Sequence, residues 1–220
     1  MTREYLDFNV IRTTPLASEP FRFALWKDAI PPATAQRLTD RFPREGFVRH
    51  QRGQGGDKTY SFLVRKAVEK NQPLETLATL DPTWQAFIMA LTGTEYRKAV
   101  GEMIGECIDD YAIDVGFFVF TEGNDISIHT DHLTKAATNV LYFGHEWQPD
   151  WGGLLSLYRK QGDGFEPFQH LPPVTGNGML LVPSPDSWHG VSPVSPSTPM
   201  LRRTLQIETW RPQGVAREPR

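Results

Sequence analysis

Residues 111–131 read YAIDVGFFVFTEGNDISIHTD, a pattern that predicts two β-strands divided by a turn. Its first half, Tyr111 to Thr121, is dense in Val, Ile and Phe, which predicts a β-strand. Glu122-Gly123-Asn124 predicts a turn, and Asp125 to Asp131 predicts a second strand. Successive side chains of a strand point to opposite faces. We therefore expect His129 and Asp131 to project from the same face.

Further elements follow on both sides of these two predicted strands. Downstream, short apolar runs divided by turns predict strands at Thr138–Gly144, Leu154–Tyr158, Met179–Val182 and Leu201–Trp210. Upstream, the pattern predicts a strand at Phe21–Ile30, a helix at Ala33–Phe42 and a long helix from Thr83 to Cys107. Asp81-Pro82 is a typical helix start, and Gly93 is a candidate break that would divide the long helix in two. Helices first and strands later predict an α+β fold with a sandwich or barrel of the jelly-roll type.

The length of 220 residues predicts a single domain, residues 1–220. We expect an N-terminal strand and helical layer at residues 1–109, a β core at 110–210 and a basic, frayed tail at 211–220. The polar, glycine-bearing segment from Glu45 to Asp57 predicts a loop that could close over a site.

Composition excludes several classes of protein. A formal net charge of −3 gives no broad basic surface, so we expect no nucleic-acid partner. No apolar run approaches the roughly 18–20 residues that span a bilayer, so we expect no membrane partner. The one cysteine, Cys107, cannot form an intrachain disulfide, which favours a reducing, cytoplasmic location. Its apolar surroundings predict a buried thiol.

A third candidate metal ligand lies downstream, in Trp188-His189-Gly190-Val191. Two imidazoles and one carboxylate, from His129, Asp131 and His189, match the facial triad of non-heme Fe(II) oxygenases, which leaves coordination positions open. Zn²⁺ is the competing ion, because the same ligands can hold it. His132 is the poorer ligand, since its parity on a strand is opposite to that of Asp131.

Arg202-Arg203-Thr204-Leu205 suggests an anion site on the last strand. An arginine that faces a metal can form a bidentate pair with the far carboxylate of a dicarboxylic keto acid. Thr204 shares the face of Arg202 and can add a hydrogen bond, whereas Arg203 lies on the other face.

In these motifs the chain resembles the Fe(II)- and 2-oxoglutarate-dependent dioxygenases, and within them the prolyl-4-hydroxylase-like group. The resemblance covers residues Tyr111 to Trp210 and depends on the order of several short motifs. These are Phe120-Thr121-Glu122-Gly123, His129-Thr130-Asp131, Asn139-Val140-Leu141-Tyr142-Phe143, Trp147 through Trp151-Gly152-Gly153-Leu154, Trp188 through Val194, and Arg202-Arg203-Thr204-Leu205.

The resemblance implies a double-stranded β-helix core with an N-terminal helical layer on one sheet. It implies the cofactor Fe(II) on His129, Asp131 and His189, with O2 and 2-oxoglutarate as cosubstrates. It assigns 2-oxoglutarate binding to Arg202, with Tyr142 and Thr204 beside it, and keeps Arg203 as the alternative if the strand is bulged. Phe120 departs from the family, where a tyrosine is common, so a hydroxyl contact is lost there.

The resemblance also implies the reaction. Family members that halogenate carry a small residue in place of Asp131, so this chain is expected to be a hydroxylase that releases succinate and CO2. Its expected substrate is an amino acid, a small metabolite or a peptide residue. Desaturation or ring formation in place of hydroxylation remains open, because in the family these reactions share one ferryl intermediate. Four cations are candidates to bind an anionic substrate, namely Arg49, Arg52, Lys58 and Arg65.

Two other classes compete with this interpretation. A cupin-like metal-binding module without oxygenase activity would need no Arg202 and would not turn over 2-oxoglutarate. A zinc hydrolase would need a general base beside the metal. Glu122 and Asp125 are the nearest acids in sequence, but a turn explains them more simply.

Overall fold

The computed structural model describes residues 5–144 and 146–212. Its α-helices are α1 (Phe8–Thr13), α2 (Pro32–Asp40), α3 (Glu75–Ala78), α4 (Pro82–Thr92) and α5 (Thr94–Ile104). The predicted long helix is divided at Gly93, which ends α4 and precedes α5. Asp81 caps α4 as expected, because its carboxylate accepts a hydrogen bond from the backbone N–H of Thr83 at 2.8 Å.

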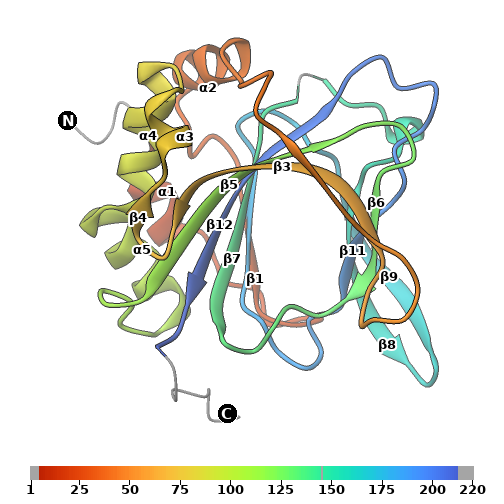
Figure 1. Cartoon of the computed structure of the whole chain (residues 1–220). Coiled ribbons are helices and arrows are strands. Elements are labelled where there is room, and N and C mark those ends of the chain that lie inside the picture. The colour runs from red at the N-terminus through yellow and green to blue at the C-terminus, as the bar shows by residue number, and fades with distance from the viewer. Residues whose placement is uncertain (1–4, 145, 213–220) are drawn as a thin grey trace.

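The strands form one curled, mainly antiparallel sheet (Figure 1). They are β1 (Phe23–Trp26), β2 (Val48–Arg52), β3 (Tyr60–Glu69), β4 (Gln72–Pro73), β5 (Ala112–Phe120), β6 (Asp125–His129), β7 (Lys135–Tyr142), β8 (Leu155–Gln161), β9 (Gly164–Leu171), β10 (Gly178–Leu181), β11 (His189–Val191) and β12 (Arg202–Trp210). Their order is β1-β10-β7-β12-β5-β3-β6-β11-β8-β9, and β2 and β4 pair with β3. This is the arrangement of a double-stranded β-helix, and the predicted fold class is confirmed.

Two apolar clusters lie on opposite faces of the main sheet. The helices cover its outer face, where Trp84 of α4 contacts Phe117 of β5 at a ring-centroid distance of 4.7 Å (Figure 1). The inner face carries a second cluster that includes Phe120 and Tyr142. Strand β12 contributes side chains to both faces of the sheet. Leu205 and Ile207 face the helices, and Arg202 and Thr204, which alternate with them, lie on the inner face.

The segment from Glu45 to Asp57 is not only a loop, and that prediction was wrong. It contains β2, which pairs along β3 with Val48 opposite Val64 and Arg52 opposite Tyr60. Every residue of β2 is exposed, so its sequence lacks the apolar alternation that marks a half-buried strand. The partner strand β3 pairs with β2 along one edge and with β5 and β6 along the other. The curled sheet therefore also contains strands from before residue 110.

Two predictions about single side chains were also wrong. Cys107 is exposed, because α5 ends at the left-handed Gly105 and the chain then turns outward. Arg211 is buried and does not belong to a frayed tail: it pairs with Glu106 at 2.7 Å and donates a hydrogen bond to the carbonyl of Lys135 at 2.6 Å. The rest of the predicted tail from residue 213 lies outside the described residues.

No helix among the described residues is long and apolar enough to cross a membrane.

Candidate active site

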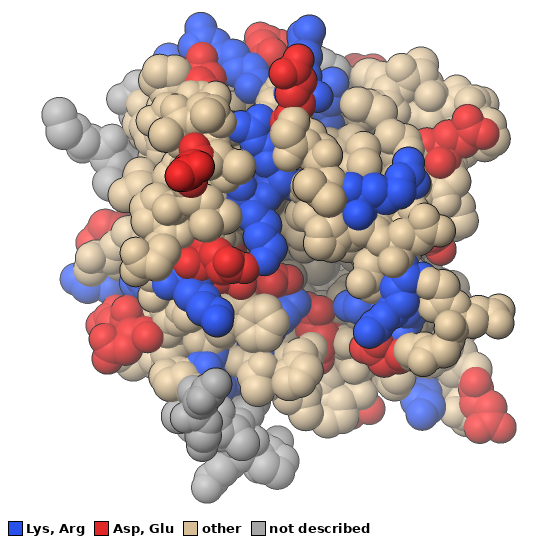
Figure 2. All heavy atoms as spheres, in the orientation of Figure 1, with Lys and Arg blue, Asp and Glu red and all other residues tan. Residues whose placement is uncertain are grey.

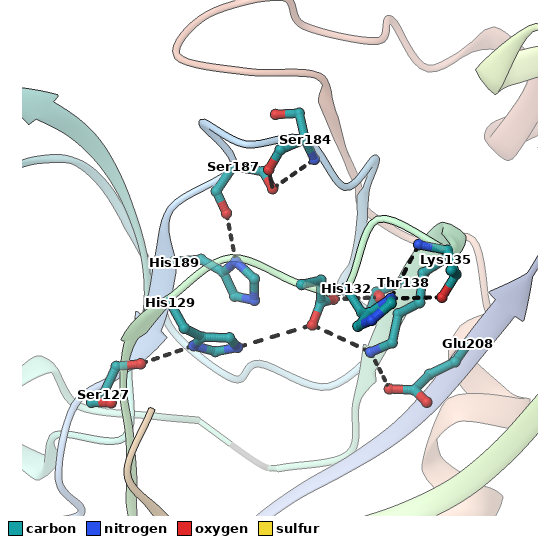
Figure 3. A network of polar contacts seen from close by, with 11 residues as sticks. Ser127, His129, His132, Lys135, Thr138, Ser184, Ser187, His189 and Glu208 are labelled. Atoms are coloured by element: carbon teal, nitrogen blue, oxygen red, sulfur yellow. Dashed lines mark hydrogen bonds and ion pairs between the residues drawn. The ribbon is translucent and has the colours of Figure 1, made fainter. Parts of the chain in front are cut away.

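The three predicted metal ligands come together at one end of the curled sheet. His129 ends β6 and His189 begins β11, and the two residues pair directly in the antiparallel register. Asp131 follows His129 by two residues, as alternation along an extended chain requires. Their ligand atoms all lie within 4.8 Å of one another, and all three side chains are buried (Figure 3). The geometry suits a single metal ion with open positions.

Hydrogen bonds fix how both imidazoles present their nitrogens. His129 Nδ1 lies 2.8 Å from the carbonyl oxygen of Ser127, and His189 Nδ1 lies 2.8 Å from that of Ser187 (Figure 3). A carbonyl only accepts, so each Nδ1 carries the proton and each Nε2 keeps its lone pair. Burial lowers the pKa of His129 to about 3 and also lowers that of His189, so both rings are neutral near pH 7.

The carboxylate of Asp131 is held from two sides. Lys135 Nζ lies 3.2 Å from Oδ1, and the Thr138 hydroxyl donates to Oδ2 at 2.6 Å. Glu208 on β12 pairs with the other side of the Lys135 ammonium at 2.7 Å. Burial opposes the charge of Asp131, but Lys135, together with the His189 ring and the Thr138 hydrogen bond, holds its pKa below the ordinary value. Asp131 is therefore an oriented anion.

Lys135 and Glu208 are site residues that the sequence analysis missed. A signal for Glu208 was present, because it shares the parity of Arg202 and Thr204 on β12 and therefore their face. Lys135 follows Asp131 by four residues, but nothing local to the sequence shows that its ammonium turns back to that carboxylate. Both side chains line the same cavity as the metal ligands.

Arg202 lies on the inner face of the sheet with polar atoms in need of a partner. Its guanidinium lies over the ring of Phe120 at 4.6 Å, and its Nε donates to the carbonyl of Gly153 at 2.7 Å. Three buried polar atoms of this cluster are among those without a hydrogen-bond partner in the described residues: Arg202 Nη1, the Tyr142 hydroxyl and Thr204 Oγ1. Thr204 and Tyr142 pair directly between β12 and β7, which places these donors side by side.

This cluster fits a bound carboxylate. A buried cation without an anionic partner is unfavourable, and burial lowers the pKa of Arg202 to about 10, which still leaves it charged near pH 7. Burial raises the pKa of Tyr142 to about 12, so its phenol stays protonated and can donate. A dicarboxylate that reaches from the metal to Arg202 would satisfy all three groups.

Arg203, the alternative anion ligand, lies on the opposite face. Its guanidinium lies over the ring of Phe42, 5.5 Å from the centroid, and Phe42 belongs to the cluster under the helices. Strand β12 is regular here, since Arg202, Arg203 and Thr204 pair in sequence with Phe120, Val119 and Phe118. No bulge brings Arg203 to the inner face.

Gly152 and Gly153 allow two close approaches, the first to Pro193 and the second to Arg202. Both have left-handed backbones, with φ of 64° and 62°. A Cβ on Gly152 would lie 2.0 Å from the carbonyl oxygen of Pro193, and one on Gly153 would lie 3.1 Å from Arg202 Cδ. Only glycine allows this close approach, which explains the two glycines after Trp151.

A cavity of about 290 Å³ connects the metal ligands with Arg202. Its apolar wall comes mainly from the inner face of the strands, and it is lined in part by Tyr60, Phe62, Ile126, Leu155, Met179, Leu181 and Val191. Lys58 and His50 also border it. The hollow is visible between charged side chains in the middle of the face shown in Figure 2.

The other candidates lie away from this cluster. His132 is exposed, and its Nδ1 contacts the hydroxyl of Thr134 at 2.7 Å. Glu122 is exposed in the predicted turn, and neither it nor Asp125 lines the cavity. Neither of these two acids is therefore placed to act as the general base that the zinc-hydrolase alternative needs.

The core of the chain matches a known family model. Residues 116–211 match the sequence model of the 2OG-Fe(II) oxygenase superfamily. No curated protein sequence matches the chain. Many solved structures share its fold, although their sequences are distant.

Three of these structures illustrate the similarity. A prolyl-4-hydroxylase of Pseudomonas putida is 16% identical, with a TM-score of 0.57, and the match covers 94% of this chain and 97% of that one. An oxidoreductase of the 2OG-Fe(II) oxygenase family from Burkholderia pseudomallei is 19% identical, with a TM-score of 0.61 and coverage of 90% and 89%. A prolyl hydroxylase of Trichoplax adhaerens, in complex with a hypoxia-inducible-factor peptide, is 14% identical, with a TM-score of 0.60 and coverage of 93% and 87%.

Fold, buried triad and matched core define an enzyme class, the 2-oxoglutarate-dependent oxygenases. The match over residues 116–211 supports the 2OG-Fe(II) oxygenase superfamily, and the chain shares its fold with prolyl-4-hydroxylases. Its cofactor is Fe(II), and its cosubstrates are 2-oxoglutarate and O2.

Proposed function

We propose that the enzyme hydroxylates an unactivated C–H bond of an amino acid, a small metabolite or a peptide residue, with release of succinate and CO2. His129, Asp131 and His189 bind Fe(II) in this proposal, and Arg202 binds 2-oxoglutarate. One observation carries it: Arg202, whose Nη1 has no hydrogen-bond partner among the described residues, lines the same cavity as the buried His-Asp-His cluster.

The residues of the site orient the bound cosubstrate and place charges beside it. Bound Fe(II) supplies the activation of O2, and the protein supplies position and electrostatics. Arg202 neutralises the distal carboxylate of the cosubstrate, while Tyr142 and Thr204 donate hydrogen bonds to it. The presence of Asp131 favours hydroxylation over halogenation, because its carboxylate takes the coordination position that a halide would need.

We also propose that the protein acts in the cytoplasm, supported by the single cysteine, which can form no intrachain disulfide.

Anaerobic titration of the apo protein with Fe(II) and then 2-oxoglutarate tests the assignment. A keto acid chelated to ferrous iron gives a weak visible charge-transfer band, and we expect this band to appear. It should be absent in His129→Ala, which loses a metal ligand, and it should persist in His132→Ala, whose ring is exposed outside the cluster.

The titration also distinguishes the alternatives. If iron binds and no band forms, 2-oxoglutarate does not chelate the metal, and the metal-binding module becomes the better explanation. If the band forms in His129→Ala as strongly as in the unaltered protein, the triad assignment is wrong.

A further inference from the structure

The metal ligands lie between two spaces. Asp131, Lys135 and Lys58 border both the inner cavity that contains Arg202 and an outer groove of about 510 Å³. The groove is lined by Asp57, Lys58, Thr130, Asp131, His132, Leu133, Lys135 and Trp210. Because Arg202 belongs to the inner cavity alone, the cosubstrate has its anion site there, and the outer groove leads to the metal from another side.

The cations around these spaces differ in whether they have an anionic partner. Lys135 pairs with Asp131 and Glu208, and Lys66 forms a close pair with Glu69. Lys58 has no hydrogen bond or ion pair with any described residue. Apart from Arg202, it is the one Lys or Arg of the described lining that is left without a partner.

The loop between β2 and β3 keeps Lys58 unpaired. Its neighbour Asp57, the nearest acid in sequence, is instead bound by Arg52 at 2.8 Å. On the other side, the backbone N–H of Thr59 donates to Ser127 Oγ at 2.8 Å, and the N–H of Ser127 donates to the carbonyl of Thr59 at 3.0 Å. Lys58 is therefore tied by its neighbours to β6, the strand that carries His129.

Lys58 is also partly removed from water. Its side chain is half-buried, and this burial lowers its pKa; the nearby Asp131 carboxylate opposes the shift, and Lys135 adds to it. A half-buried ammonium without a direct partner is less stable than one that contacts an anion. A negative group that enters from solvent would supply this contact.

We propose, as a refinement that rests on the proposed function, that the substrate carries a carboxylate and that Lys58 binds it in the outer groove. The ammonium then holds one end of the substrate and orients the rest of it toward the metal ligands. Tyr60 and Phe62, whose rings stack 5.1 Å apart in the cavity wall, contact the apolar part of the substrate. Arg202 remains the partner of 2-oxoglutarate.

The test uses matched pairs of small probes on the anaerobic Fe(II)–2-oxoglutarate complex. The probes are the L-amino acids and their C-terminal amides, together with capped dipeptides that contain Asp or Glu and their Asn or Gln counterparts. Binding is read from the change in the charge-transfer band, and turnover is read from succinate formation in air. We expect at least one acid to bind about tenfold tighter than its amide, the effect of one lost charged hydrogen bond.

Variants then assign this preference to one residue. Lys58→Met should remove the preference for the acid and leave the Kd for 2-oxoglutarate unchanged. Lys98→Met is the matched control, because it makes the same change on an exposed residue of α5 and should keep the preference. Arg52→Met should weaken acid binding as well, because it releases Asp57 to pair with Lys58, and Asp57→Asn should not weaken it.

The outcomes separate this inference from the proposed function. If no band forms with 2-oxoglutarate, the proposed function itself fails. If the band forms but no acid is preferred over its amide, the carboxylate assignment is wrong. If Lys58→Met raises the Kd for 2-oxoglutarate instead, Lys58 belongs to the cosubstrate. Preference among free amino acids or among acidic dipeptides identifies which source of carboxylate the groove accepts.

Discussion

At the scale of single residues, Lys135 connects the metal site to the stability of the fold. Its buried ammonium lies 3.2 Å from Asp131 and 2.7 Å from Glu208. Removing one member of a buried ion network costs about 3 kcal/mol, because charges are left unpaired. We expect Lys135→Met to lose about this much free energy of unfolding without metal, and less with Fe(II), whose charge replaces the ammonium beside Asp131.

Urea unfolding with and without Fe(II), under anaerobic conditions, measures both values. The double variant Lys135→Met/Glu208→Met is the control, since replacing both partners of a buried pair by apolar groups costs less than breaking it. Equal losses for Lys135→Met in the presence and absence of metal would show that Lys135 does not act through Asp131.

The two neighbouring arginines provide a second prediction at this scale. Arg202→Ala removes a buried charged donor, and we expect the Kd for 2-oxoglutarate to rise by about tenfold to a hundredfold. Arg203→Ala alters the opposite face, beside Phe42, and should change this Kd by less than about twofold. The charge-transfer titration measures both, and the reverse result would move the anion site to Arg203.

The inner-face residues of β12 show why part of the site could be predicted from sequence. Arg202 and Thr204 share a face because strand side chains alternate, and alternation is a local property. The pairing of Lys135 with Glu208 joins residues 73 positions apart, so it depends on how β7 and β12 come together. Local patterns contain no such information.

At the scale of elements, the helical layer is held to the sheet by one aromatic residue above all. Trp84 on α4 is fully buried, contacts Phe117 and Phe143 at ring-centroid distances of 4.7 and 4.8 Å, and donates its indole N–H to the carbonyl of Leu38 at 3.1 Å. We expect Trp84→Ala to cost about 3–5 kcal/mol in the free energy of unfolding.

Chemical denaturation measures this loss. Met89→Ala on the same helix is the matched control: its side chain is 53% exposed, so the change should stay within about 0.5 kcal/mol. A similar loss in both variants would mean that helix propensity of α4, and not its contact with the sheet, determines the effect.

Elements differ in how far their sequence reveals them. Strand β7 is buried along its whole length, and its apolar run indicated a strand at Thr138–Gly144. Strand β2 is exposed along its whole length, and nothing in its polar sequence marks it as a strand. It exists because β3 offers an edge with which it can pair, and β3 itself was missed because Arg65 and Lys66 interrupt its apolar residues.

At the scale of the whole molecule, the helices and the sheet share one apolar cluster that extends from Leu6 to Ile207. We therefore propose that the described residues unfold as a single domain in one cooperative step. Far-ultraviolet circular dichroism and tryptophan fluorescence should give the same urea midpoint. Two separate midpoints would show that the helical layer is an independent unit.

If the described residues unfold in one cooperative step, a bound cofactor should stabilise the entire fold. Any ligand that binds only the folded state stabilises it, by about 2.7 kcal/mol at a free concentration one hundred times its Kd. For a chain of this size that corresponds to a rise in Tm of about 5–10 °C. If 2-oxoglutarate chelates the iron at one end and contacts Arg202 at the other, as proposed, it should raise Tm strongly only after Fe(II) is bound.

Anaerobic thermal unfolding with Fe(II), with 2-oxoglutarate, with both, and after a chelator separates these contributions. In Arg202→Met the step caused by Fe(II) should remain and the step caused by 2-oxoglutarate should be largely lost, because Arg202 is not one of the candidate metal ligands. If 2-oxoglutarate raises Tm equally without metal, Arg202 binds it independently. The cavity would then be a carboxylate site beside the metal site, and the coupling on which turnover depends would be absent.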